Sequence, residues 1–146
     1  MRYDEHRGRL TRLLIDLLAN LAANASPKVM HREKVPLLLV TLLEVSEKEA
    51  DLLASCIDAL DSLCQDAEVE MYLVGEKRLL FILLDVLKMQ EDARVLGKAM
   101  RLVSNMSIHT SCISHILSSN ILSVIANVVL PHLRVGSMHD EEASKI

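Results

Sequence analysis

One pattern recurs three times in the chain and limits what it can fold into. The stretch ADLLASCIDALDSLCQDAEV, residues 50–69, reads as one long buried helix, and related stretches occupy residues 10–26 and 95–110. Equivalent residues in the three stretches stand 42 or 43 positions apart, and the apolar segments before the second and third align with one another and with residues 121–130. Such a period is typical of a helical solenoid. The aligned sets include Leu18, Leu60 and Val103; Leu21, Leu63 and Met106; Ile15, Ile57 and Met100; and Val35, Leu79 and Ile121.

The composition favours helices. There are two Tyr, one Phe and no Trp, with only four Gly and three Pro, so Leu, Ile, Val, Ala and Met must fill the core. Leu, Met and Ala are good helix formers. An all-β fold would need more turn residues and more aromatic residues. The sequence therefore predicts an all-α protein.

The apolar spacing predicts where the helices lie. Residues 35–45 are so uniformly apolar that a buried parallel strand would look the same, but the repeat alignment favours a helix. Ser26 before Pro27 predicts a helix start, and Ser46 with Glu49 forms a capping-box pattern that predicts a helix from residue 47. The expected helices are 10–24, 27–32, 35–45, 47–65, 66–74, 79–87, 93–107, 111–118 and 121–130.

Three segments follow from this pattern. Residues 1–9 are polar and are expected to be flexible, residues 10–133 form the repeat domain, and residues 134–146 form a disordered tail. The first dozen residues do not have the composition of a secretory signal, and no apolar run is long enough to cross a bilayer. We expect a cytoplasmic protein, with the nucleus as the other candidate compartment.

The distribution of charge indicates which classes of partner to expect. The net charge is −4, and no basic stripe is interleaved with aromatic residues, so nucleic acid is not an expected partner. Residues 44–76 hold ten carboxylates and one lysine. One interpretation is that they attract a basic segment of a partner protein. The other is that they are the solvated outer faces of helices.

No set of residues predicts an enzyme, a cofactor or a metal. His109, Cys112 and His115 are spaced by three, which suits one side of a zinc site, but no fourth ligand is near. Cys56 and Cys64 align with packing positions, so a redox role is not expected. There is no nucleophile with a base and no Gly-rich phosphate loop.

Each of the three long related stretches contains a segment that resembles the signature of the armadillo-repeat family, Leu-x-Asn-Leu-Ala. Residues 18–22, LANLA, match it fully; residues 103–107, VSNMS, match it well; and residues 60–64, LDSLC, have Ser in place of Asn. HEAT repeats are the near alternative. The resemblance covers roughly residues 10–133. It implies a right-handed superhelix with two full three-helix repeats, 27–65 and 66–107, and partial repeats at both ends.

The resemblance also implies a concave groove lined by the third helices. In the family, the signature Asn holds the backbone of an extended peptide, and a Trp four residues earlier often packs beside it. Here Asp, Asp and Arg stand in the Trp positions, so the Trp ladder used for nuclear import signals is absent. The residues expected to line the groove are Asp16, Asn20, Asp58, Ser62, Lys98, Arg101 and Asn105.

These observations predict a non-catalytic protein-interaction module that binds an extended segment, with basic residues among its contacts. The alternative is a structural segment of a larger armadillo-containing assembly factor or co-chaperone for cytoskeletal or ciliary machinery. This alternative arises because neither end of the array has an obvious polar cap, so self-association through the ends is also expected.

Overall fold

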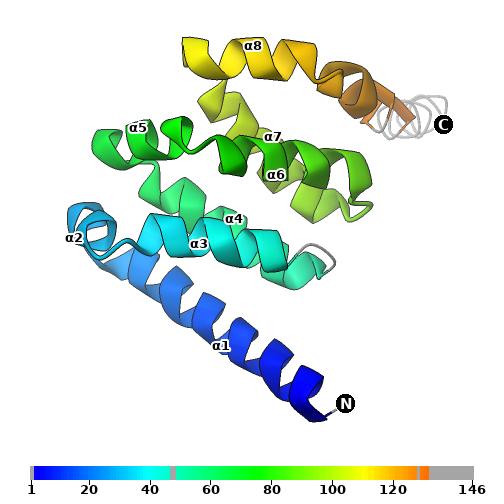
Figure 1. Cartoon of the computed structure of the whole chain (residues 1–146). Coiled ribbons are helices and arrows are strands. Elements are labelled where there is room, and N and C mark those ends of the chain that lie inside the picture. The colour runs from blue at the N-terminus through cyan, green and yellow to red at the C-terminus, as the bar shows by residue number, and fades with distance from the viewer. Residues whose placement is uncertain (1, 47–48, 128, 132–146) are drawn as a thin grey trace, which may run out of the picture.

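Every element in the computed structural model is a helix (Figure 1). The structure describes residues 2–46, 49–127 and 129–131, and no strand occurs within these ranges. The all-α prediction is therefore confirmed for the described residues. The helices are α1 (Arg2–Asn24), α2 (Pro27–Arg32), α3 (Val35–Val45), α4 (Ala50–Leu63), α5 (Ala67–Gly75), α6 (Lys77–Met89), α7 (Ala93–Met106) and α8 (Thr110–Ser118), followed by helical residues 121–127 and 129–131.

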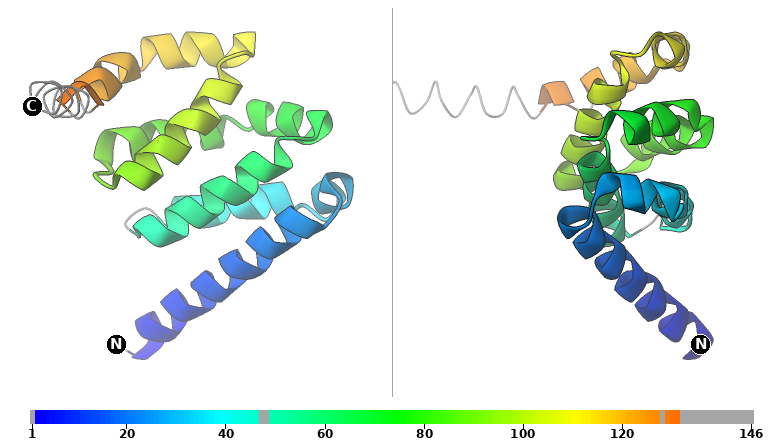
Figure 2. Two further views of the ribbon diagram at one scale, coloured as in Figure 1. Left: turned by 180° about the vertical axis from the view of Figure 1, so that it is seen from behind. Right: turned by 90° about the vertical axis from the view of Figure 1, so that its left-hand side faces the viewer.

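The helices pack in an order that follows the repeat in the sequence. Helix α1 packs against α4, and α4 packs against α7; these three lie side by side and run in the same direction (Figure 2, left). Helix α2 packs against α5 and α5 against α8, while α3 contacts α6. Each of α3 and α6 also packs on the long helix that follows it, α4 and α7 respectively. The three long helices thus form one layer, and the shorter helices cover its other side.

The core lies between these two layers. Leu39 and Leu43 on α3, Leu53 and Leu60 on α4, and Leu83 on α6 are completely buried. Helix α3 is buried at six of its eleven positions, which explains its nearly unbroken apolar sequence. The spacing of the buried residues on α4 leaves one side for solvent, so the same helix supplies both core and surface.

Polar side chains fix where several helices begin. Asp66 accepts hydrogen bonds from the backbone N–H groups of Glu68 and Val69 at the start of α5, and Asp92 accepts from those of Arg94 and Val95 at the start of α7. Gln90 Oε1 accepts from the backbone of Glu91 and Asp92 and shapes the preceding turn. These bonds satisfy N–H groups that have no partner within the helix.

Two predicted helix starts differ from the structure by three residues or more. Helix α1 begins at Arg2 rather than Leu10, so the segment predicted to be flexible is helical from Arg2 on; apolar spacing marks only where a helix packs, and polar residues extend it. Ser46 does not open α4, which begins at Ala50. Its hydroxyl instead donates to the carbonyl of Leu42 at 2.6 Å, buried at the end of α3. The predicted tail at 134–146 lies outside the described residues.

Adjacent leucines of α3 test the position of the core. Leu39 is fully buried, whereas Leu38 is 39% exposed. We expect Leu39→Ala to lower the free energy of unfolding by about 2–5 kcal/mol and Leu38→Ala by less than about 1.5 kcal/mol, because only the first leaves a cavity. Urea denaturation followed by circular dichroism measures both. Equal losses would show that α3 does not face the core as described.

Lys34, between α2 and α3, has a left-handed backbone conformation with φ 63°. Such a conformation brings the Cβ of a lysine close to backbone, which glycine avoids. We expect Lys34→Gly to raise the free energy of unfolding by roughly 0.5–1 kcal/mol. Lys28→Gly, within α2, is the matched control and should lower it by a similar amount. Denaturant midpoints compare the two; destabilisation by Lys34→Gly would contradict the backbone assignment.

Candidate binding surface on α1, α4 and α7

All seven residues predicted to line a groove lie on the three long helices of one layer. Each helix places one pair, four residues apart, on its solvent side, while Ile15 and Ile57 face the core. Six of the seven are exposed and Lys98 is half-buried. The pairs are Asp16 and Asn20 on α1, Asp58 and Ser62 on α4, and Arg101 and Asn105 on α7.

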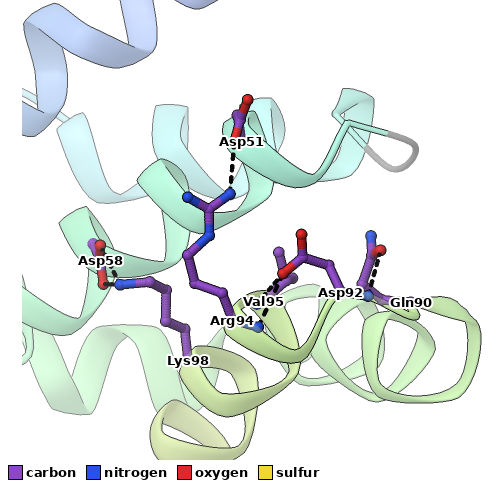
Figure 3. Close-up of polar contacts among 7 residues, drawn as sticks. All are labelled: Asp51, Asp58, Gln90, Asp92, Arg94, Val95 and Lys98. Carbon is purple, nitrogen blue, oxygen red and sulfur yellow. Dashed lines mark hydrogen bonds and ion pairs between the residues drawn. The ribbon is translucent and has the colours of Figure 1, made fainter.

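Two of these residues bind each other across the seam between α4 and α7. Lys98 Nζ donates to both carboxylate oxygens of Asp58 at 2.7 Å (Figure 3). Asp58 and Lys98 were both expected to line the groove and to offer their charges to a partner. The structure satisfies both within the chain, so a partner would have to exchange these contacts.

A second ion pair lies further along the same seam. Arg94 donates to Asp51 Oδ1 at 2.6 Å, and the two residues point toward each other from α7 and α4 in Figure 3. The hydrogen bond and the charge of Arg94 hold the pKa of Asp51 below its usual value, and the pKa of Arg94 is raised in turn. Sequence reasoning missed this pair, although its spacing of 43 residues equals the repeat period.

Asp61 makes a third set of polar contacts between α4 and α7. Its carboxylate accepts a hydrogen bond from the amide of Asn105 at 3.2 Å and lies 3.9 Å from Arg101 Nε. Asn105 therefore has one amide proton already engaged. Asp61 was also missed, because the signature directs attention to Ser62 beside it.

The seam between α1 and α4 is different. In the described part of the chain, neither the side chain of Asp16 nor that of Asn20 has a hydrogen-bond or ion-pair partner; the backbone carbonyl of Asn20 accepts a hydrogen bond from the side-chain amide of Asn24. Ser62 likewise makes no side-chain bond there. The polar groups at the α1 end of this surface are thus available, and those at the α7 end are paired.

Most carboxylates of the acidic stretch at residues 44–76 have a polar partner within the fold. Seven of its ten carboxylates have partners in the structure: Glu44 and Glu76 with Arg78, Asp51 with Arg94, Asp58 with Lys98, Asp61 with Arg101, Asp66 with the start of α5, and Glu70 with His109. Five of these acids pair with four basic side chains that follow in the sequence, Arg78, Arg94, Lys98 and Arg101. This arrangement favours internal pairing over attraction of a basic partner.

The histidines and cysteines do not assemble a metal or redox site within the described residues. No group of three or more metal-ligating side chains occurs there. His109 Nε2 lies 2.9 Å from Glu70, His115 meets the edge of Phe81, and Cys112 is buried. Burial raises the pKa of Cys56 and of Cys64 to about 12 and also raises that of Cys112, which keeps the thiols protonated.

The described residues line two small pockets, among others, that could be considered as sites. One, of about 200 Å³, lies where α4 and α7 end, between Cys64, Glu70 and Asn105. The other, of about 250 Å³, lies between α6 and α8 beside Phe81 and His115. Both fall below the range of roughly 300–1,000 Å³ that small-molecule sites occupy. An extended surface is therefore a better candidate site than either pocket.

In the described part of the chain, no helix alone is long and apolar enough to span a bilayer; only α8 taken with residues 121–131, across a bend of 65°, meets that test.

Comparison with known proteins gave no match, whether to family models, curated proteins or solved structures.

Because the thiols are buried or half-buried and protonated, we expect them to react slowly with thiol reagents. At pH 8 a pKa of about 12 leaves only about one thiolate in ten thousand, so we expect Cys56 and Cys64 to react with Ellman's reagent at least roughly a thousandfold more slowly than a free thiol. In urea all three thiols should react at once. A fast-reacting thiol in the native protein, located by mass spectrometry, would contradict these environments.

Proposed function

We propose that this chain is an armadillo-like protein-interaction module. In this proposal α2–α4 and α5–α7 are two complete three-helix repeats of a right-handed superhelix. Helix α1 is a lone third helix, and α8 with residues 121–131 forms the first two helices of another repeat. The observation that carries the proposal is the series packing of α1, α4 and α7. Those helices bear the related segments LANLA, LDSLC and VSNMS.

The ligand would be an extended segment of a partner protein lying across the three helices. Asn20, Ser62 and Asn105 stand at equivalent positions and offer amide or hydroxyl groups to a peptide backbone, which needs both donors and acceptors. Asp16, without an ion-pair partner in the ranges described, would accept a basic side chain. Asp58, Lys98 and Arg101 would contribute by exchanging their exposed internal pairs, each worth about 0–1 kcal/mol.

The function proposed is binding without catalysis, in the cytoplasm or nucleus. A surface formed by successive helices is long and shallow, which suits a peptide better than a reaction that must exclude water. Partner recognition would depend more on backbone hydrogen bonds than on charge, because the acids of α4 are already paired with α7.

The test begins with selection of binding peptides from a displayed library of unstructured peptides, using the full chain. Fluorescence anisotropy then compares the wild type with the double variant Asn20→Ala, Asn105→Ala. Each lost hydrogen bond should cost about 1 kcal/mol, so affinity should fall roughly thirtyfold. Circular dichroism should not change, since both side chains are exposed.

Asn127→Ala is the matched control, because Asn127 is an exposed asparagine on a helix outside the α1, α4 and α7 layer. It should leave affinity unchanged. Undiminished affinity of the double variant, or failure to select any peptide, would contradict the proposed surface.

A second candidate function is structural: a segment of a larger assembly factor or co-chaperone for cytoskeletal or ciliary machinery. The specific observation in its favour is that α1 exposes Leu10, Leu13 and Leu17 to solvent. If this function holds, Leu17→Asp should abolish capture of cellular partners while the Asn20→Ala, Asn105→Ala variant retains them. The opposite result favours the peptide-binding module.

A further inference from the structure

Three of the four exposed leucines of α1 occupy positions that are buried in the two equivalent helices. Leu10, Leu17 and Leu21 are 66%, 54% and 40% exposed. Their counterparts, one and two repeat periods later, are all buried. Those counterparts are Leu52, Ala59 and Leu63 on α4 and Val95, Leu102 and Met106 on α7. Because α4 packs on α1 and α7 packs on α4, this flank of each helix is the one that meets the preceding helix. We call Leu10, Leu13, Leu17 and Leu21 the leucine stripe.

The opposite end of the helical layer also has uncovered positions. They lie on the flank of α7 that faces away from α4. On α4, Ala54 and Ile57 are buried on the flank toward α7, but their counterparts on α7 are Gly97, which is exposed, and Met100, which is partly exposed. No heavy atom lies within 4 Å of where a Cβ on Gly97 would stand. Among the described residues, no following helix covers this flank of α7 as α7 covers the same flank of α4.

The helices after α7 show the same opening. Leu122 is 56% exposed, whereas Leu80, its counterpart on α6, is buried. Leu117 on α8 is 65% exposed, and its counterpart Val74 on α5 is buried. We call Gly97, Met100, Leu117 and Leu122 the open end. Val74 lines one pocket with Leu102 and Met106 of α7, and Val74 and Leu80 line another beside α8; nothing described closes over Leu117 and Leu122 in this way.

We propose that a second copy of this chain covers the open end with its leucine stripe, head to tail. In the proposed repeat, α1 takes the place of a third helix, and α8 with residues 121–131 takes the places of a first and a second helix. Joining the two makes one complete three-helix unit from two copies. The proposal goes beyond peptide binding and does not depend on it.

Size and shape favour this occupant over a second leucine stripe. Four leucines so exposed leave an apolar patch on the order of a few hundred Å², the range in which patches on monomers become interaction sites. A stable dimer needs about 600–1,000 Å² from each partner. Two stripes meeting alone fall short of that, but α1 docked on the open end would cover α7 and residues 121–131 together. The bulky leucines also suit a flank that carries Gly97.

Charge supports the same register. Suppose that α1 of one copy docks on α7 of the other as α7 docks on α4 within a chain. Asp16 of the first copy then lies one repeat step from Arg101 of the second. Asp16 has no ion-pair partner in the described ranges, and Arg101 is 77% exposed and lies 3.9 Å from Asp61. Arg9 would come beside Arg94, whose charge Asp51 already neutralises at 2.6 Å. Repetition of such an unlike-surface contact extends a chain of copies rather than closing a two-fold dimer.

Sedimentation velocity on the full chain tests the proposal with two variants, Leu17→Asp in the stripe and Leu122→Asp in the open end. Both leucines are exposed, so the circular dichroism spectra of the variants should match that of the wild type. The wild type should show a mass that rises with concentration above the 16.3 kDa of one chain. Each variant alone should remain at the mass of one chain, because each has lost one of the two surfaces.

The decisive sample is an equal mixture of the two variants. Each retains the surface that the other lacks, so the mixture should form a species of twice the single-chain mass and nothing larger. Met71→Asp, at an exposed residue of α5 away from both surfaces, is the control and should assemble as the wild type does. A wild type that stays monomeric, a Leu122→Asp variant that still dimerises, or a mixture that stays monomeric would each overturn the proposal.

Discussion

Contact between neighbouring long helices is the interaction on which the rest of this structure depends. Helix α4 packs on both α1 and α7, and it is buried at eight of its fourteen positions. Burying a leucine such as Leu53 or Leu60 contributes about 1.5–3 kcal/mol relative to leaving it exposed. Because successive long helices bury one another, the core is shared along the layer and is not confined to any one helix. The fold therefore depends on contact between successive helices.

The sequence predicts this arrangement well because the repeat alignment and the burial have the same cause. Ile15, Ile57 and Met100 stand one period apart because each occupies the same place on its helix, so the period locates the helices. Helix ends were harder. At Ser46 the sequence offers a plausible cap for the following helix, but its hydroxyl binds the carbonyl of Leu42 instead. Local patterns cannot decide between two backbone partners when tertiary burial selects one.

The candidate surface was predicted at the level of residues but not of contacts. A signature read along one helix places Asp58 and Ser62 on a common face, yet it does not show that Lys98 on the next helix is within 2.7 Å of Asp58. Asp51 and Arg94 carried a usable signal, since opposite charges one period apart come to lie on adjacent helices. Reading charge with the same period as the apolar residues would have predicted that α7 neutralises α4.

The α1 end and the α7 end of the candidate surface differ in how their polar groups are paired and in how their leucines are buried. Between α4 and α7 the polar groups are paired across the seam, whereas on α1 Asp16 and Asn20 have no side-chain partner in the described ranges and border the leucine stripe. Asn20 and Leu21 are neighbours in sequence, so a helix docked on the stripe would lie beside the row of signature residues. In head-to-tail assembly, Asn105 of one copy and Asn20 of the next would stand one step apart, as Ser62 stands from each within a chain. The proposed assembly would therefore lengthen the peptide-binding surface without changing its chemistry.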